Sequence, residues 1–164
     1  MLSDLPPSFL CRIGELGGSD LVDDVMVVFH NVERLIDEAE EYMWRLTDRY
    51  NMMSLPHLEA ATERGVMFQL LQTKGFEYPP EWPGTWTILS DVRLKGTLKV
   101  KISDYANIFI AMSEKEVAVV SFPAVNGRFD YLGFTSRDRR VHDWCADVFQ
   151  FYWERARFQE HFIE

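Results

Sequence analysis

The strongest constraint on the fold is a strand–helix–strand pattern between residues 42 and 71. Tyr42–Thr47 is rich in aromatic and β-compatible residues, which predicts a strand. Ser54 is a suitable N-cap for a helix over Leu55–Arg64, and Gly65 suits the left-handed position that follows a helix. Val66–Leu71 is apolar on both alternating faces except at one glutamine, as in a strand covered on both sides. Because such crossovers join parallel strands, the sequence predicts a sheet that is at least partly parallel.

Further strands are predicted after this unit. Residues 98–102 alternate between apolar side chains and lysine, which indicates a strand with one solvated face near the sheet edge. Asn107–Met112 and Val117–Phe122 are apolar runs joined by a polar segment, which predicts a central antiparallel hairpin. Asn126-Gly127 predicts a tight reversal that leads into a short strand or loop.

Helices are predicted at both ends of this strand-rich region. Residues 8–16 follow two prolines and predict a short helix, and apolar side chains recur at helical spacing from Asp24 to Glu41. Ser136 is expected to cap a last helix with a broad apolar stripe. The pattern therefore predicts an α/β fold with a mixed, partly parallel sheet flanked by helices. We expect one domain over residues 1–164, made of an arm (1–23), a core (24–134) and a C-terminal helix (136–162).

The charge of the chain argues against polyanionic partners. Its net charge is −9 at pH 7 and its pI is near 4.9, so the summed field repels nucleic acid. Residues 137–140 hold the densest basic run, which a solvated helix start explains, with a phosphate or partner contact as the alternative. No run approaches the ~18 apolar residues of a membrane-spanning helix. We expect neither direct nucleic-acid binding by this chain nor a membrane partner.

The sequence predicts no metal, cofactor or catalytic motif. Cys11 and Cys145 lack CxxC spacing and no secretory signal precedes them, which indicates a reducing, cytoplasmic environment. The histidines lie on separate predicted elements without metal-ligand spacing: His30, His57, His142 and His161. The sequence contains neither a phosphate-binding loop nor a Gly-x-Ser-x-Gly elbow.

Polar and aromatic residues at predicted strand ends are the best candidates for a ligand site. Crossover sheets open their ligand crevices where strands stop and loops begin. The predicted ligand-binding residues are Trp44, Asp48, Gln72, Arg93, Asp104 and Asn107. Thr47 and Thr73 lie at the same strand ends, and Trp82 and Trp86 are placed to roof the crevice with Arg93. Turn formation explains Asp48, Asp104 and Asn107 at least as well as ligand binding does.

Aromatic residues of the last predicted helix have two interpretations. Trp144, Phe149 and Trp153 fit a buried core, because aromatic side chains supply large buried areas where a helix packs on a sheet. Part of this set is alternatively a dimer or partner contact. The sequence does not decide between the two.

Several segments resemble a known protein family. They are residues 5–16 (LPPSFLCRIGEL), 38–44 (EAEEYMW), Gly133-Phe134 and 143–156 (DWCADVFQFYWERA). The chain resembles, over most of its length, the middle, sensor domain of the archaeal methanogenesis regulatory proteins, a group that includes the filamentation regulators of methanogens. The resemblance implies a regulator in which a small-molecule effector or partner acts here, and DNA is held by a winged-helix unit in cis or in trans. We also expect the chain to form a homodimer. This sequence contains no segment that predicts a winged helix.

The order of predicted elements also resembles one half of a phospholipase D-like fold. Active members of that superfamily use a His-x-Lys pair in the hairpin, and residues 107–122 contain no histidine. Three functions are therefore weighed: a non-catalytic effector-sensing domain, which we favour, a dimerisation or interaction module without a small ligand, and a degenerate phosphoesterase-like enzyme.

Overall fold

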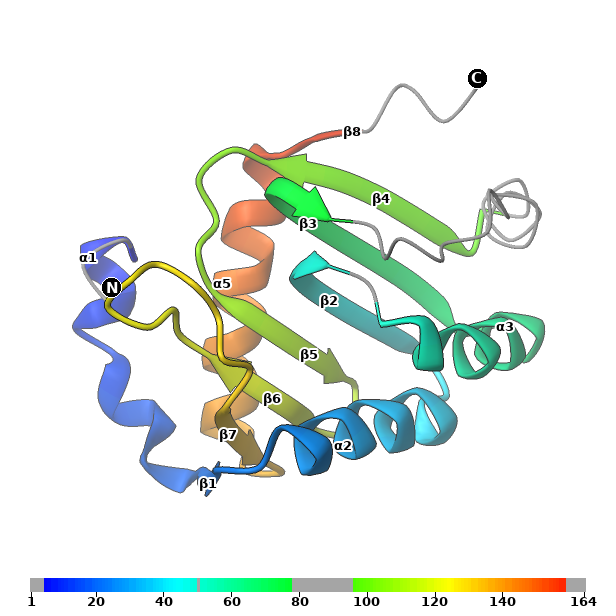
Figure 1. Cartoon of the computed structure of the whole chain (residues 1–164), viewed down its shortest axis with the longest axis horizontal. Coiled ribbons are helices and arrows are strands. Elements are labelled where there is room, and N and C mark those ends of the chain that lie inside the picture. Colours follow the sequence, from blue (N-terminus) through cyan, green and yellow to red (C-terminus); the bar gives the residue numbers. More distant parts are fainter. Residues whose placement is uncertain (1–4, 50, 78–95, 159–164) are drawn as a thin grey trace.

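A mixed β-sheet forms the centre of the computed structural model, which describes residues 5–49, 51–77 and 96–158. Its strands lie in the order β1-β7-β6-β5-β2-β3-β4-β8 (Figure 1). Their bounds are β1 Asp20–Val22, β2 Tyr42–Arg49, β3 Met67–Glu77, β4 Leu98–Ser103, β5 Phe109–Ser113, β6 Val117–Ser121, β7 Gly133–Ser136 and β8 Arg157–Phe158.

The predicted crossover is confirmed. β2 and β3 are parallel, in a register that runs from Tyr42 opposite Met67 to Thr47 opposite Gln72. Helix α3 (Leu55–Glu63) connects them, and Gly65 follows it with a φ of 90°, the left-handed conformation that glycine adopts without steric cost. β4 adds a third parallel strand beside β3. The sheet is partly parallel because these three strands share one direction.

The rest of the sheet is antiparallel. β5 and β6 form the predicted hairpin, and β5 also pairs with β2, which joins the antiparallel and parallel halves. β4 lies next to the two-residue strand β8, so the predicted position near an edge is also confirmed. Three short strands, β1, β7 and β8, were not predicted from the sequence; the short strand or loop expected at residues 128–131 is a loop.

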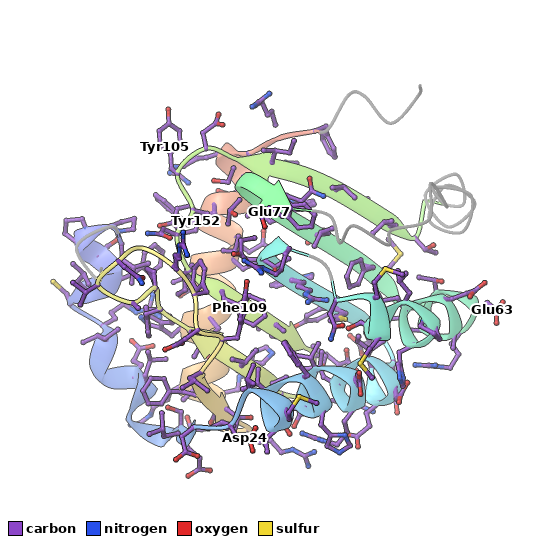
Figure 2. All side chains as sticks on the ribbon, viewed as in Figure 1. Asp24, Glu63, Glu77, Tyr105, Phe109 and Tyr152 are labelled. Atoms are coloured by element: carbon purple, nitrogen blue, oxygen red, sulfur yellow. The ribbon has the colours of Figure 1, made fainter. Side chains whose placement is uncertain are left out.

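Helices cover both faces of the sheet. α2 (Val25–Glu38) and α3 lie on one face, and α5 (Arg139–Arg155) crosses the other face with α1 (Pro7–Leu10) and the 3₁₀ helix η2 (Ile13–Gly18) beside it (Figure 1). Asp24 and Glu63 mark the beginning of α2 and the end of α3 in Figure 2. Each face buries its own apolar cluster, one around α2 and one around α5. Among the described helices, none is both long and apolar enough to cross a bilayer.

Helix α2 ends earlier than the predicted Glu41. Ala39 has an extended backbone, and side chains distant in sequence take the terminal carbonyl groups. Arg64 donates to the Ile36, Asp37 and Ala39 carbonyls at 3.0, 3.0 and 3.4 Å, and Lys115 Nζ donates to the Glu38 carbonyl at 2.7 Å. The apolar period alone does not reveal this tertiary capping.

One predicted N-cap is wrong, and the other, Ser54, holds the N-cap position of α3 without a side-chain bond. Asp138 caps α5, and its carboxylate accepts from the Arg140 amide at 2.8 Å, whereas Ser136 Oγ accepts from the Asp138 amide and donates to the Gly18 carbonyl. Ser54 makes no capping bond, because a 3₁₀ turn (η3, Met52–Ser54) capped by Asn51 runs directly into α3. The first predicted helix is likewise split into α1 and η2.

The prediction of a partner contact for Trp144, Phe149 and Trp153 is corrected by their burial. Their exposed fractions are 0%, 0% and 9%, so the chain itself covers these side chains. Phe149 stacks between Trp44 and Trp153 at centroid distances of 5.1 and 5.7 Å, and Trp144 Nε1 donates to the Phe9 carbonyl at 3.3 Å. They form the core between α5 and the sheet.

Candidate functional site

A cleft of about 430 Å³ opens at the carboxyl ends of β2 and β3. It lies where parallel strands end, the usual place for ligand sites in sheets of this kind. Its volume falls in the range typical of small-molecule pockets. The lining residues are Asp48, Arg49, Thr73, Gly75, Glu77, Ala106, Asn107, Gly127, Arg128 and Phe129.

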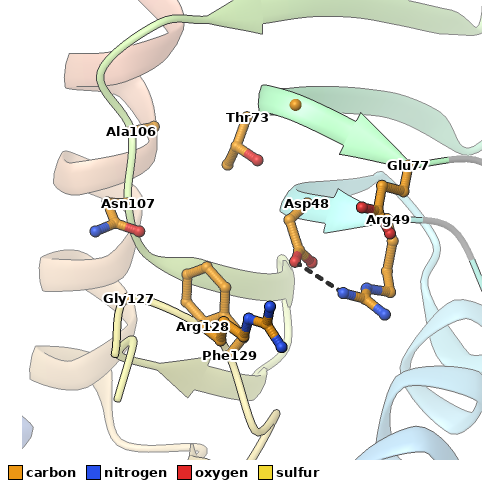
Figure 3. Close-up of a pocket in the computed structure, with 10 residues that line it drawn as sticks. Asp48, Arg49, Thr73, Glu77, Ala106, Asn107, Gly127, Arg128 and Phe129 are labelled. Atoms are coloured by element: carbon orange, nitrogen blue, oxygen red, sulfur yellow. Dashed lines mark hydrogen bonds and ion pairs between the residues drawn. The ribbon is translucent and has the colours of Figure 1, made fainter. Parts of the chain in front are cut away.

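Three segments of the chain form the walls of this cleft (Figure 3). The first wall is the end of β2 and β3, where the register shifts after Thr47 so that Arg49 lies opposite Glu77. The second wall is the connection from β4 to β5, which carries Asn107. The third wall is the loop of residues 122–132 between β6 and β7, which we call the strap.

The strap is held against the sheet by Tyr131. Its hydroxyl donates to the two carboxylate oxygens of Asp48 at 2.8 and 3.1 Å, and the Arg49 guanidinium lies 5.2 Å from the centre of its ring. The Tyr131 ring also meets Phe109 of β5 edge-on at 5.6 Å. Burial raises the pKa of the Tyr131 hydroxyl above its ordinary value, and the hydrogen bond to Asp48 raises it further. Tyr131 has a φ of 62°, a left-handed conformation that a bulky residue seldom adopts.

The charged side chains of the cleft balance one another. Asp48 and Glu77 contribute two carboxylates, and Arg49 and Arg128 contribute two guanidinium groups. Asp48 lies 3.5 Å from Arg49 and also holds Tyr131. Within the described residues, the Glu77 carboxylate and the Arg128 guanidinium form neither an ion pair nor a side-chain hydrogen bond.

The structure brings two of the predicted ligand residues into this cleft. Asp48 and Asn107 line it, together with Thr73 at the same strand end. Whether they bind a ligand stays a prediction. Arg93, Trp82 and Trp86 lie outside the described residues.

Three other predicted ligand residues lie elsewhere. Trp44 faces α5, where it stacks on Tyr42 at 4.5 Å and on Phe149. Gln72 is buried within the sheet, because β3 continues to Glu77 instead of ending near Leu71. Asp104 is exposed and lies 3.4 Å from Arg157 of β8.

Sequence reasoning missed most of the cleft wall. The missed set is Arg49, Gly75, Glu77, Ala106, Gly127, Arg128 and Phe129. Asn126-Gly127 gives a local signal, since Gly127 has a φ of 77° in the predicted reversal. No local sequence pattern indicates that this reversal lies over the ends of β2 and β3, because its position depends on the β6–β7 pairing and on Tyr131.

The cleft lining contains no strong nucleophile in the described residues. Its described lining contains no histidine or cysteine; Cys145 lies on the buried face of α5, where burial raises the pKa of its thiol. The lysine of the hairpin, Lys115, lies at the far end of β5, where it bonds to the end of α2. In the described part of the chain no three side chains of metal-ligating type gather at one point.

The fold is shared with solved structures of two kinds. No model of a protein family matches the sequence, and no curated protein matches it. TrmBL2, described as an archaeal chromatin protein with a novel mode of DNA binding, has a TM-score of 0.67 and 19% identity over 86% of this chain. This chain spans 54% of TrmBL2, about half of its length.

The second kind comprises two bacterial proteins, one of which is described as a phospholipase D family member. NucT from Helicobacter pylori has a TM-score of 0.57 and 13% identity, over 86% of this chain and 97% of its own. Nuc from Salmonella typhimurium, described as a phospholipase D family member, has a TM-score of 0.50 and 10% identity, over 79% and 89% of the two chains. At these identities the likeness establishes the fold alone. The chain therefore has a phospholipase D-like α/β fold.

Proposed function

We propose that this chain is a non-catalytic, effector-sensing domain of an archaeal transcriptional regulator. The observation that carries the proposal is a charge-balanced cleft, at the strand ends of a fold shared with TrmBL2, whose described lining contains neither histidine nor cysteine. In this proposal an effector binds in the cleft, and the change passes to a winged-helix DNA-binding unit in cis or in trans. The sequence resemblance to the sensor domain of the methanogenesis regulators supports the same function.

The cleft is poorly suited to phosphodiester chemistry. A phosphoryl group needs cationic groups around it and a nucleophile that attacks phosphorus. Here Asp48 and Glu77 offset the two arginines, and the hairpin lacks the histidine of the His-x-Lys pair. A degenerate phosphoesterase is for these reasons the weaker proposal. Reproducible hydrolysis of a phosphodiester by repurified protein would revive it.

A dimerisation module without a small ligand is the second candidate. Leu21 of β1 and Met26 of α2 are exposed by 66% and 62%, and β1 is a sheet edge with unpaired backbone groups. This surface suits a homodimer better than the buried aromatic residues of α5 do. A dimer that forms at nanomolar concentration, with no ligand retained in its cleft, would favour this candidate.

Native mass spectrometry of the purified chain tests the leading proposal directly, because it reports subunit number and any retained ligand together. Thr73→Val and Asn107→Ala alter the cleft wall without removing a charge. We expect both to reduce the effector-induced rise in Tm and the response of the full-length regulator. Lys99→Ala, on an exposed position outside the cleft, is the control. If metabolite pools produce no binding and both cleft variants respond normally, the proposal fails.

A further inference from the structure

The cleft offers two unengaged charges of opposite sign. Glu77 stands at the end of β3, and Arg128 stands on the strap (Figure 3). Within the described residues, neither side chain has an ionic or hydrogen-bonding partner, and they do not pair with each other. Asp48 and Arg49, in contrast, already bind Tyr131 or one another. Glu77 and Arg128 are therefore the charged groups that a ligand meets without displacing a protein contact.

The sum of charges limits which ligand fits. A phosphate or other compact anion near Arg128 is also repelled by the carboxylates of Asp48 and Glu77. A simple cation near Glu77 is repelled by the two arginines. A molecule that carries both charges satisfies both sides. The guanidinium group suits a carboxylate in particular, because its planar fork gives two parallel hydrogen bonds.

The uncharged part of the wall suits a small carbon skeleton. Phe129 and Ala106 present apolar surface, and Gly75 and Gly127 leave backbone without side chains beside the space. Thr73 adds a hydroxyl group that lies at the strand end. The cleft volume of about 430 Å³ holds a molecule of amino-acid size.

We infer that the cleft binds a zwitterionic small molecule of the amino-acid type, an inference that rests on the proposed sensing function. Its ammonium group faces Glu77 and Asp48, and its carboxylate faces Arg128 with Arg49 behind it. The carbon skeleton lies against Phe129. The strap supplies both Arg128 and Phe129, so this ligand bridges the strap and the sheet edge.

Calorimetric titration with matched probes tests the ligand class. The probes are free proteinogenic amino acids, their carboxamides, their N-acetyl derivatives and inorganic phosphate. We expect a free amino acid to bind, and loss of either charged group from it to weaken binding about tenfold or more, as for a hydrogen bond to a charged group.

Two charge-neutralising variants assign the two ends of the ligand. In Arg128→Gln the free amino acid should bind no better than its carboxamide, and in Glu77→Gln it should bind no better than its N-acetyl form. Lys99→Gln and Glu63→Gln remove one charge of each sign from exposed positions outside the cleft, and we expect both to bind as the parent chain does.

The outcomes separate this inference from the proposed function. Phosphate that binds as tightly as any amino acid, or amino-acid binding that survives both Arg128→Gln and Glu77→Gln, overturns the zwitterion and leaves the cleft as a sensing site. A non-zwitterionic molecule retained by the purified chain likewise overturns the zwitterion and leaves the cleft as a sensing site. If no probe binds and Thr73→Val leaves the regulator's response intact, both the inference and the proposed function fail.

Discussion

Tyr131 links the strap to the sheet through one hydroxyl group, and that group makes the link sensitive to alkaline pH. Its pKa is raised by burial and by the Asp48 hydrogen bond. The folded chain therefore keeps this proton at a pH where the unfolded chain, with a tyrosine pKa of about 10, releases it. The stability that this group contributes is present below pH ~10 and is lost as pH rises above it.

We expect Tyr131→Phe to change the alkaline limb of the stability curve. At neutral pH the loss of the hydrogen bond should cost about 1 kcal/mol of unfolding free energy. Above pH ~10 the parent should lose stability more steeply than the variant. The reason is that the unfolded parent releases the phenol proton of residue 131, and the variant has no such proton. Urea unfolding at several pH values measures both effects. Tyr105→Phe is the control, because Tyr105 is 81% exposed. Parallel curves for parent and variant would contradict this account.

Individual site residues were predictable where their signal was local. Asp48 and Asn107 were found because polar, turn-forming residues end apolar runs. Trp44 was misplaced because strand alternation puts it on the α5 side of β2, two positions before the buried Leu46. Gln72 was misplaced because β3 continues past the apolar run to Glu77. Those last strand residues gain their partners from β2 and β4, which no local pattern specifies.

At the scale of elements, the β6–β7 pairing places the strap and depends on Gly133. A methyl group at this position would overlap the Val120 carbonyl oxygen and would lie 3.0 Å from Ser121 Cβ. We expect Gly133→Ala to force the two strands apart and to cost about 1–3 kcal/mol, as overpacking does. Urea unfolding gives the free energy, and hydrogen exchange of the strap amides should rise with it.

Gly14 in η2 provides the matched control for this substitution. A methyl group there meets no atom within 4 Å, so Gly14→Ala should leave the unfolding free energy unchanged or slightly raised. An equal loss of stability in both variants would mean that the loss does not come from the close approach of β6 and β7 at Gly133.

Elements long enough to show a repeating apolar pattern in the sequence were predictable. Strands that form only by pairing with a neighbouring strand were not. β2, α3 and β3 follow from apolar patterns and a terminal glycine. The edge strands β1 and β8 span three and two residues, too few for any alternation to be read. They exist because β7 and β4 offer them backbone partners.

At the scale of the whole molecule, the net charge argues against DNA binding by this chain alone. TrmBL2 is described with a mode of DNA binding, and this chain shares its fold over about half of that protein's length. The net charge of −9 repels the phosphate backbone of DNA. The basic run at the start of α5 is also partly neutralised, because Arg137 bonds to Glu116 at 2.8 Å and Arg139 lies 3.4 Å from Asp143.

The chain alone is therefore expected to bind no DNA at physiological salt. Fluorescence anisotropy with a labelled duplex should show no saturable binding at an ionic strength of about 0.15 M. Asp143→Asn releases Arg139 from its acid but leaves the summed field negative, so this variant should also fail to bind. Binding by the parent chain that weakens steeply with added salt would instead place a phosphate-contacting surface on this domain, and the separate DNA-binding unit would no longer be needed to explain a regulatory role.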